Sequence, residues 1–238
     1  MFLKSKTAII SGASRGIGAA LAIALSKHNM NLALFARNEE ELNKVAAACK
    51  ANGSNCIVFS CDVSNEEQVK NAISETANAY GNVDFLVNNA GFGVFKSVLD
   101  INADEWDNVM NVNAKSNFLT CKYAVPHLQA NKSGHIINVA SDVAKRTFAN
   151  GSLYCASKYA QNAFSEALRK EVRQDNIKVS VIYSGLVDSH FHSIGHGHSE
   201  AETWLKENDM ADAILYVMNT PPHVVIDELM IHPMSQDY

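Results

Sequence analysis

A tyrosine and a lysine lie one helical turn apart in the Tyr-Cys-Ala-Ser-Lys segment that starts at Tyr154 and ends at Lys158. Helical side chains at this spacing share one face. The free tyrosine pKa of about 10 is too high for efficient proton transfer at neutral pH, and a neighbouring ammonium lowers it by favouring the phenolate. Ser141 comes earlier, at the end of a hydrophobic run, and its hydroxyl could hold a carbonyl oxygen for Tyr154 to protonate. The same spacing also occurs on solvated helix faces, so it gains meaning only beside other motifs.

A glycine-rich turn stands near the start of the chain, in the run SGASRGIG from Ser11 to Gly18. It follows a short hydrophobic run and precedes an amphipathic stretch of helical period. Glycines let the backbone turn tightly and approach a pyrophosphate, and the helix N-terminus offers free N–H groups and a positive dipole end. The spacing is G-x-x-x-G-x-G, and its position between a strand and a helix predicts a dinucleotide-binding site.

The residues after the second hydrophobic run bear on which dinucleotide binds. Sites that favour NAD carry Asp or Glu there for the ribose 2′-hydroxyl. This chain has Ala36 and Arg37 instead, and Arg15 lies within the glycine turn. Two guanidiniums suit a 2′-phosphate, which they bind with charge-assisted hydrogen bonds, so the sequence predicts NADP(H). The alternative is that Arg37 pairs with the carboxylates of Glu39–Glu41, an exposed interaction that is common and weak.

Short aliphatic runs alternate with longer amphipathic stretches along the chain. This alternation predicts an α/β protein: a single doubly wound Rossmann domain, residues 1–238, with a parallel sheet of about seven strands. The expected strands are Thr7–Ser11, Asn31–Phe35, Cys56–Phe59, Val83–Val87, His135–Val139, Lys178–Tyr183 and Val224–Met230. The expected helices are about Ile17–Lys27, Glu39–Ala51, Asn65–Tyr80, Ala103–Gln129 and Ser152–Gln174. Such sheets bind ligands at the carboxyl ends of their strands, where the glycine turn and Ser141 would lie.

The composition excludes several classes of protein. The chain has 238 residues, of which 47% are hydrophobic and 19% charged, and a formal net charge of −5. A chain of this size builds a core without metal or disulfide bonds, and its mild acidity argues against nucleic acid as a partner. Its five cysteines include no Cys-x-x-Cys pair, which indicates reduced thiols. We find no signal-peptide core and no apolar run of about eighteen residues, so we expect a cytoplasmic protein without a membrane partner.

Together these motifs resemble the classical short-chain dehydrogenase/reductase (SDR) family over essentially the whole chain. The resemblance rests on Gly12-x-x-x-Gly16-x-Gly18, Asn88-Asn89-Ala90-Gly91, Asn113, Ser141 and Tyr154-x-x-x-Lys158, in the order and spacing of the family. It implies that Tyr154 is the general acid/base and that Ser141 orients and polarises the carbonyl. It further implies that Lys158 lowers the tyrosine pKa and holds the nicotinamide ribose. Asn113 would keep a water in a proton relay from Lys158 to solvent.

The resemblance also implies a set of contacts with NADP(H). These are Gly12, Ser14, Arg15, Gly16, Ile17, Gly18, Arg37, Asp62, Val63, Asn89, Ala90, Gly91, Tyr154, Lys158, Gly185, Val187 and Ser189. Asp62 and Val63 would contact the adenine, and Gly185 would allow close backbone approach to the nicotinamide. The family usually has Pro-Gly at Ser184-Gly185, so the end of this strand is less constrained here.

The segment from about residue 186 to 208 is the expected substrate loop of the family. It carries His190, His192, His196 and His198, whose spacing is not that of a structural zinc site. We therefore expect no metal and instead a polar or pH-sensitive lid. Near the motifs, Phe92, Phe95 and Phe148 would line an apolar substrate pocket or simply pack in the core.

The combined pattern predicts an NADP(H)-dependent oxidoreductase that interconverts a small carbonyl compound and a secondary alcohol. One alternative is a 3-oxoacyl-[acyl-carrier-protein] reductase, although that group usually has a Gly-Gly pair near its C-terminus and no glycine follows Gly197 here. The pair Lys145-Arg146 is the one basic feature suggestive of carrier-protein docking. A non-catalytic NADPH-binding sensor is the other alternative, yet all four catalytic positions are kept. The family also implies a homo-oligomer, a tetramer or dimer formed through the long helices.

Overall fold

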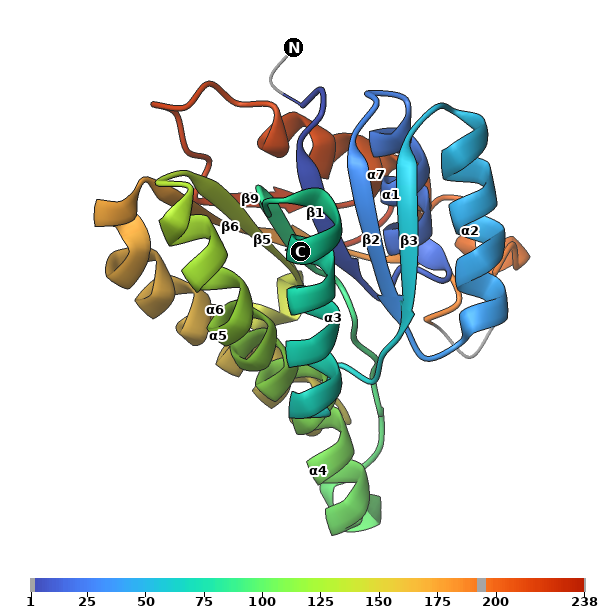
Figure 1. Ribbon diagram of the computed structural model, residues 1–238. Helices are drawn as coiled ribbons and strands as arrows, with labels where there is room; N and C mark the ends of the chain where they lie inside the picture. The colour runs from blue at the N-terminus through green and yellow to red at the C-terminus, as the bar shows by residue number, and fades with distance from the viewer. Residues whose placement is uncertain (1–2, 192–195, 238) are drawn as a thin grey trace.

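A parallel sheet forms the centre of the protein, as Figure 1 shows for the computed structural model, which describes residues 3–191 and 196–237. The order of its strands is β3-β2-β1-β4-β5-β6-β9, with every pair parallel. Their bounds are β1 Thr7–Ser11, β2 Asn31–Ala36, β3 Asn55–Ser60, β4 Phe85–Asn88, β5 Gly134–Ser141, β6 Ile177–Ser184 and β9 Glu228–Ile231. This is the seven-stranded Rossmann sheet that the sequence predicts, and the fold class is confirmed.

Helices cover both faces of the sheet, so the strands are buried from both sides (Figure 1). On one face lie α1 (Gly16–Ser26), α2 (Glu39–Ala51) and α7 (Glu207–Met218), whose apolar side chains join one core cluster. On the other face α3 (Glu66–Tyr80), α5 (Ser116–Ala130) and α6 (Ser152–Val172) join a second cluster. In β1, Ala8 and Ile10 point to the first cluster and Ile9 to the second, as the two-residue period of a strand requires.

Asparagine caps determine where several helices begin. The Asn38 side chain accepts a hydrogen bond from the Glu41 amide at the start of α2, and Asn65 accepts one from Gln68 at the start of α3. Such caps satisfy backbone donors that have no partner within the helix. The expected helix Glu39–Ala51 matches the observed bounds of α2.

Some elements differ from the expectation. The predicted helix Ala103–Gln129 is α4 (Ala103–Met110), a π-helical turn (Asn111–Lys115) and then α5. The predicted strand Val224–Met230 starts only at Glu228, because the Val224 amide turns back to the Pro221 carbonyl. The sequence did not predict α7 or the small parallel pair of β7 (Val187–Asp188) and β8 (Leu205–Lys206).

The strand order brings distant motifs to one edge. β1 lies between β2 and β4, so the connections after β1 and β4 leave the sheet in opposite directions at its carboxyl edge. The glycine turn follows β1, Asn89–Gly91 follows β4, and Ser141 ends β5. Open α/β sheets bind ligands at such a switch point. Within the described residues, no helix is both long and apolar enough to span a membrane.

Candidate active site

A cleft of about 1270 Å³ runs along the carboxyl edge of the sheet. Its wall includes most of the residues that the sequence predicts for a cofactor and for catalysis. They are Gly12, Ser14, Arg15, Gly16, Ile17, Arg37, Asp62, Val63, Asn89, Ala90, Gly91, Ser141, Tyr154, Lys158, Gly185, Val187 and Ser189. Gly18 and Asn113 are not in the wall; both are buried behind it. The cleft thus joins the glycine turn at one end to Tyr154 at the other.

The glycine turn is packed too closely for side chains. Gly12 has a φ of +66°, and a Cβ there would lie 2.9 Å from the Ala90 Cα. A Cβ on Gly18 would lie 2.4 Å from the Gly12 carbonyl oxygen. The Asn89 side chain donates to the carbonyls of Ser11 and Gly12, both at 3.2 Å, and so ties the end of β4 to the turn. The free helix N-terminus behind the turn is suited to a pyrophosphate, and the residues present therefore fit a dinucleotide.

Arg15 and Arg37 are exposed and line the cleft. In the described chain, the partner of Glu40 and Glu41 is Lys44, and no ion pair joins Arg37 to Glu39–Glu41. The charge of Arg37 does act on Asp62: burial raises the pKa of that carboxyl, but hydrogen bonds from Ser64 and the Arg37 charge leave it below its usual value. Both arginines line the cleft, and the charge of Arg37 acts on a carboxylate of the cleft wall.

Tyr154, Lys158 and Ser141 lie together in the wall of the cleft. Tyr154 and Lys158 lie in the first turns of α6, which starts at Ser152, and both are buried. The Lys158 Nζ lies 5.9 Å from the centre of the Tyr154 ring. The same amine donates to Gln161 Oε1 at 3.0 Å and to the Val139 carbonyl at 3.3 Å. Gln161 is one helical turn beyond Lys158 on α6. This spacing could have predicted the contact, which is not among the sequence expectations.

Burial dominates the ionisation of this pair. It raises the pKa of Tyr154, and the Ser141 hydroxyl partly offsets that rise while the charge of Asp142 adds to it. Burial also lowers the pKa of Lys158 to about 8. The sequence expectation that a lysine depresses the tyrosine pKa is therefore opposed, in the protein alone, by loss of water around both groups.

Asn113 lies in the π-helical turn, outside the cleft wall, and its side chain is held by hydrogen bonds to Phe92 and Ser157. Its side chain donates to the Phe92 carbonyl at 2.8 Å and to Ser157 at 3.0 Å, and accepts from the Phe92 amide at 3.0 Å. Its own carbonyl accepts a hydrogen bond from the Asn117 side chain at 2.7 Å. Asn113 therefore anchors the loop after Gly91 onto α6, and Asn117 continues the polar network to Gln161 at 3.2 Å.

Tyr154 belongs to a cluster of aromatic rings that includes three phenylalanines, two of which contact it directly. Phe95 and Phe191 lie with ring centroids 5.4 and 5.5 Å from that of Tyr154, and Phe148 lies 5.9 Å from Phe95. Gly151 makes room for this cluster, because a Cβ there would lie 2.6 Å from the Phe148 ring. Phe92, Phe95 and Phe148 all line the cleft, as one of the two sequence interpretations has it. Phe191 completes the set and was not predicted.

Asp188, near the start of the expected substrate loop, is held by two hydrogen bonds. Its carboxylate accepts from the Gly197 amide at 2.8 Å and from Lys206 Nζ at 3.0 Å, and these contacts hold its pKa below the usual value. His190 and His196 stack with ring centroids 5.1 Å apart. Among residues 3–191 and 196–237, no group of three or more His, Cys, Asp or Glu side chains is placed to hold a metal. His192 lies outside the described residues.

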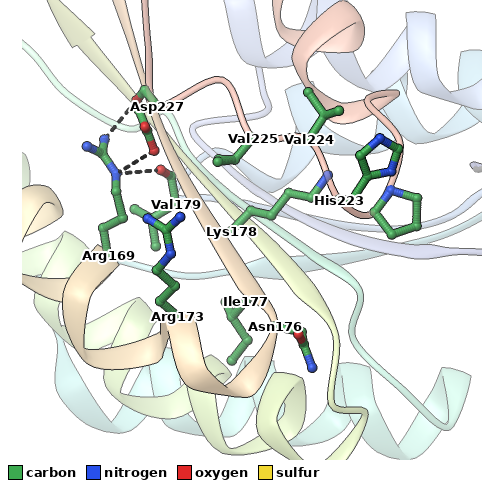
Figure 2. A pocket seen from close by; sticks show the side chains of 11 residues that line it. Arg169, Arg173, Asn176, Ile177, Lys178, Val179, His223, Val224, Val225 and Asp227 are labelled. Carbon is green, nitrogen blue, oxygen red and sulfur yellow. Dashed lines mark hydrogen bonds and ion pairs between the residues drawn. The ribbon is translucent and has the colours of Figure 1, made fainter.

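A smaller hollow of about 160 Å³ lies at the opposite edge of the sheet, beside the amino end of β6 (Figure 2). Two of the cations that line it, Arg169 and Lys178, donate hydrogen bonds to backbone carbonyls. Arg169 donates to the carbonyls of Val179 and Asp227, at 3.0 and 2.8 Å, and Lys178 Nζ donates to the Pro221 carbonyl at 2.7 Å. These contacts fasten α6 and β6 to the segment that leads into β9, so the hollow has a structural role.

Comparison with known proteins agrees with this geometry. The short chain dehydrogenase family matches residues 6–194. An uncharacterized oxidoreductase of Staphylococcus epidermidis is 32% identical over 232 residues, which cover 98% of this chain and 99% of that protein. Another from Staphylococcus aureus is 31% identical over the same length.

Two solved structures are similar over nearly their whole length. An alcohol dehydrogenase from the archaeon Thermococcus sibiricus, complexed with 5-hydroxy-NADP, superposes with a TM-score of 0.93 at 30% identity, covering 98% of both chains. A metagenomic short-chain oxidoreductase in complex with NADP gives a TM-score of 0.88 at 30% identity, covering 99% of this chain and all of that one.

Proposed function

The chain belongs to the short-chain dehydrogenase family of oxidoreductases, and from this premise we propose that it interconverts a carbonyl and a secondary alcohol with NADP(H). The observation that carries the proposal is one cleft with a glycine turn at one end and Ser141, Tyr154 and Lys158 at the other. That span suits a dinucleotide whose reactive ring reaches the tyrosine. Both similar structures at 30% identity hold NADP or a derivative of it.

The chemistry divides between cofactor and protein. A bound nicotinamide cofactor supplies or accepts the hydride. Ser141 holds the carbonyl oxygen, and the Tyr154 hydroxyl gives that oxygen its proton in reduction and takes it back in oxidation. Lys158, when charged, stabilises the phenolate that Tyr154 becomes. Asn113 has an indirect role: its side chain holds the loop after Gly91 against α6.

NADP(H) rather than NAD(H) is proposed because of Arg15 and Arg37. Both are exposed at the cleft, and in the described chain neither forms an ion pair with a carboxylate of α2. A 2′-phosphate there would accept paired, charge-assisted hydrogen bonds. An unphosphorylated ribose would leave both cations without that partner.

The substrate that this site favours has an apolar group beside its carbonyl. The rings of Phe95 and Phe191 contact Tyr154, Phe148 packs on Phe95, and the segment that begins at Leu186 lies beside them in the cleft wall as the proposed substrate loop. The carrier-protein alternative loses support, because Lys145 is engaged by Glu228 at 3.1 Å and Arg146 by Asp142. We also propose a homo-oligomer formed through α5 and α6, where Phe118 and Tyr159 are exposed.

The proposal is tested by NADPH and NADH oxidation assays run in parallel on a panel of ketones and aldehydes. Alicyclic and aryl ketones should turn over faster than small ketoacids, and NADPH should be strongly preferred. Tight NADPH binding without turnover of any carbonyl would instead support a sensor, and a strong NADH preference would refute the role of the two arginines.

A further inference from the structure

Asp142 is a buried carboxylate directly after the catalytic serine, and several groups converge on it. Its side chain is 5% exposed. Its Oδ1 accepts from the Ser141 hydroxyl at 3.1 Å, and its Oδ2 accepts from Arg146 Nε at 2.9 Å. His232 Nε2 lies 3.3 Å from the same oxygen, and Gln236 Nε2 donates to it at 2.8 Å. Two of these partners, His232 and Gln236, come from the C-terminal tail.

Gln236 is bonded at both ends of its amide. While its nitrogen donates to Asp142, its Oε1 accepts from the Leu186 amide at 2.7 Å. Leu186 begins the segment proposed as the substrate loop. One side chain of the tail therefore connects the residue beside the catalytic serine to the first residue of that loop.

Gly185 provides the space for this connection. A Cβ at Gly185 would lie 2.2 Å from Gln236 Oε1 and 2.7 Å from His232 Cδ2. The missing side chain therefore accommodates the tail, and Gly185 also lines the cleft, where the resemblance implies close approach of the nicotinamide. The Gly185 amide also donates to the Ile231 carbonyl at 2.8 Å, which holds the start of the tail against the end of β6.

The position of Asp142 matters for the chemistry because the serine hydroxyl has a single proton. In this structure Asp142 Oδ1 lies 3.1 Å and the Ser184 carbonyl 3.3 Å from Ser141 Oγ, so both can accept that proton, as the Tyr154 oxygen also can. A shift of Asp142 would redirect the hydroxyl that must face a carbonyl oxygen. The contacts of Asp142 Oδ2 with Arg146, His232 and Gln236 prevent such a shift.

Resting on the proposed function, we propose that Gln236 is a positioning residue of the active site. It holds Asp142, and through it the Ser141 hydroxyl, and it fixes the entrance of the substrate loop at Leu186. The tail after β9 is then part of the catalytic apparatus within a single chain.

The test compares Gln236→Met with Gln236→Glu in NADPH-dependent reduction of the best ketone of the panel. Methionine keeps the length and removes both hydrogen bonds, so kcat/KM should fall about tenfold or more at every pH. Glutamate keeps an acceptor for Leu186. Only its protonated form can donate to Asp142, and a second carboxylate beside the first has a raised pKa.

The activity of Gln236→Glu relative to the wild type should therefore recover towards 1 near about pH 6 and fall to the Gln236→Met level near about pH 9. Among the described residues, Asp142 contacts Gln236 directly, Arg146 and His232 contact the same Asp142 oxygen, and Asp237 is the next residue in the chain; all four are common to all variants. Met234→Ala, in the same tail but fully exposed, is the control and should match the wild type.

Amide hydrogen exchange gives a readout that does not depend on turnover. The Leu186 amide should exchange faster in Gln236→Met than in the wild type and Met234→Ala. Wild-type activity of Gln236→Met, a relative activity of Gln236→Glu that does not change with pH, or unchanged exchange at Leu186 would each overturn the proposal. A wild-type protein inactive on every carbonyl would instead refute the proposed function. The exchange result would then still show whether Gln236 holds the Leu186 amide.

Discussion

Lys158 is a buried amine whose hydrogen-bond partners, Gln161 and the Val139 carbonyl, are both neutral. Without a carboxylate to stabilise its charge, burial lowers its pKa from the ordinary 10.5 to about 8. The same burial raises the pKa of Tyr154. At neutral pH the free protein thus holds a protonated lysine beside a protonated tyrosine, which is the state that reduction requires.

This gives a pH prediction with a definite sign. Because the pKa of Lys158 is lowered, its cation is lost as pH rises through about 8 rather than 10.5. In the reduction direction, kcat/KM for NADPH, which reports ionisations of the free enzyme, should fall by up to about tenfold per pH unit above that value. Lys158→Arg keeps its charge to about pH 12 and should show lower activity without this decline. A wild-type profile that stays flat to about pH 10 would contradict the assignment.

At the scale of elements, the glycine turn joins β1 to α1 through contacts that leave no room for a Cβ. A Cβ on Gly18 would meet the Gly12 carbonyl oxygen, a Cβ on Gly12 would meet Ala90, and the Asn89 side chain donates to the turn from the end of β4. The geometry of the anion site therefore depends on close packing of backbone against backbone, and it is sensitive to the addition of one methyl group.

Gly18→Ala should lower the free energy of unfolding by about 1–3 kcal/mol and weaken NADPH binding at least about tenfold, because its Cβ would lie 2.4 Å from the Gly12 oxygen. Gly81→Ala is the matched control. Gly81 has a φ of +79° and no atom within 4 Å of its would-be Cβ, so alanine there costs stability alone. Chemical denaturation and fluorescence titration with NADPH measure the two effects. Equal loss of NADPH affinity in both variants would show that the turn is not the binding site.

The elements that the sequence predicted are those with strong local patterns. Strand Thr7–Ser11 and helix Glu39–Ala51 are observed with the bounds expected, because a continuous apolar run and an asparagine cap mark them. The strands β7 and β8 have only two residues each, which is too short for an alternation of apolar and polar residues to be detected. The start of β9 was misjudged because the valines before Glu228 have strand propensity but follow a proline turn.

The residues of the candidate site also fall into those that local motifs predict and those that only the structure reveals. The glycine turn and the Tyr154–Lys158 pair are motifs at fixed spacing, and the cleft brings them together. Gln236 and Phe191 were missed because their partners lie far along the chain, and no periodicity links Asp142 to position 236. Such contacts depend on how segments far apart in the sequence pack together on the folded sheet, which a local sequence pattern does not encode.

At the scale of the whole molecule, one sheet edge carries the proposed cofactor wall, the proposed catalytic residues and the tail that contacts Asp142. A ligand lying along the whole cleft would contact the segments after β1, β2, β3, β4, β5 and β6 at once. Binding should therefore stabilise the entire fold rather than one loop. The size of that stabilisation is fixed by ligand affinity and concentration.

At about 100 times its dissociation constant, NADPH should add about 2.7 kcal/mol to the free energy of unfolding and raise Tm by about 5–10 °C. NADH at the same concentration should raise Tm much less in the wild type. Arg37→Ala should reduce the NADPH shift to nearly that of NADH, because the 2′-phosphate loses a guanidinium. Thermal unfolding monitored by circular dichroism measures all three. Equal shifts for the two cofactors in the wild type would contradict the assigned preference.

The central claim is that Tyr154 gives the carbonyl oxygen its proton, and Tyr154→Phe tests it most directly. Phenylalanine keeps the ring that packs against Phe95 and Phe191 and removes only the hydroxyl. Carbonyl reduction at saturating NADPH should fall by about 10²–10⁴-fold, while the NADPH dissociation constant changes little. A Tyr154→Phe variant that reduces the same ketone at the wild-type rate would contradict the account.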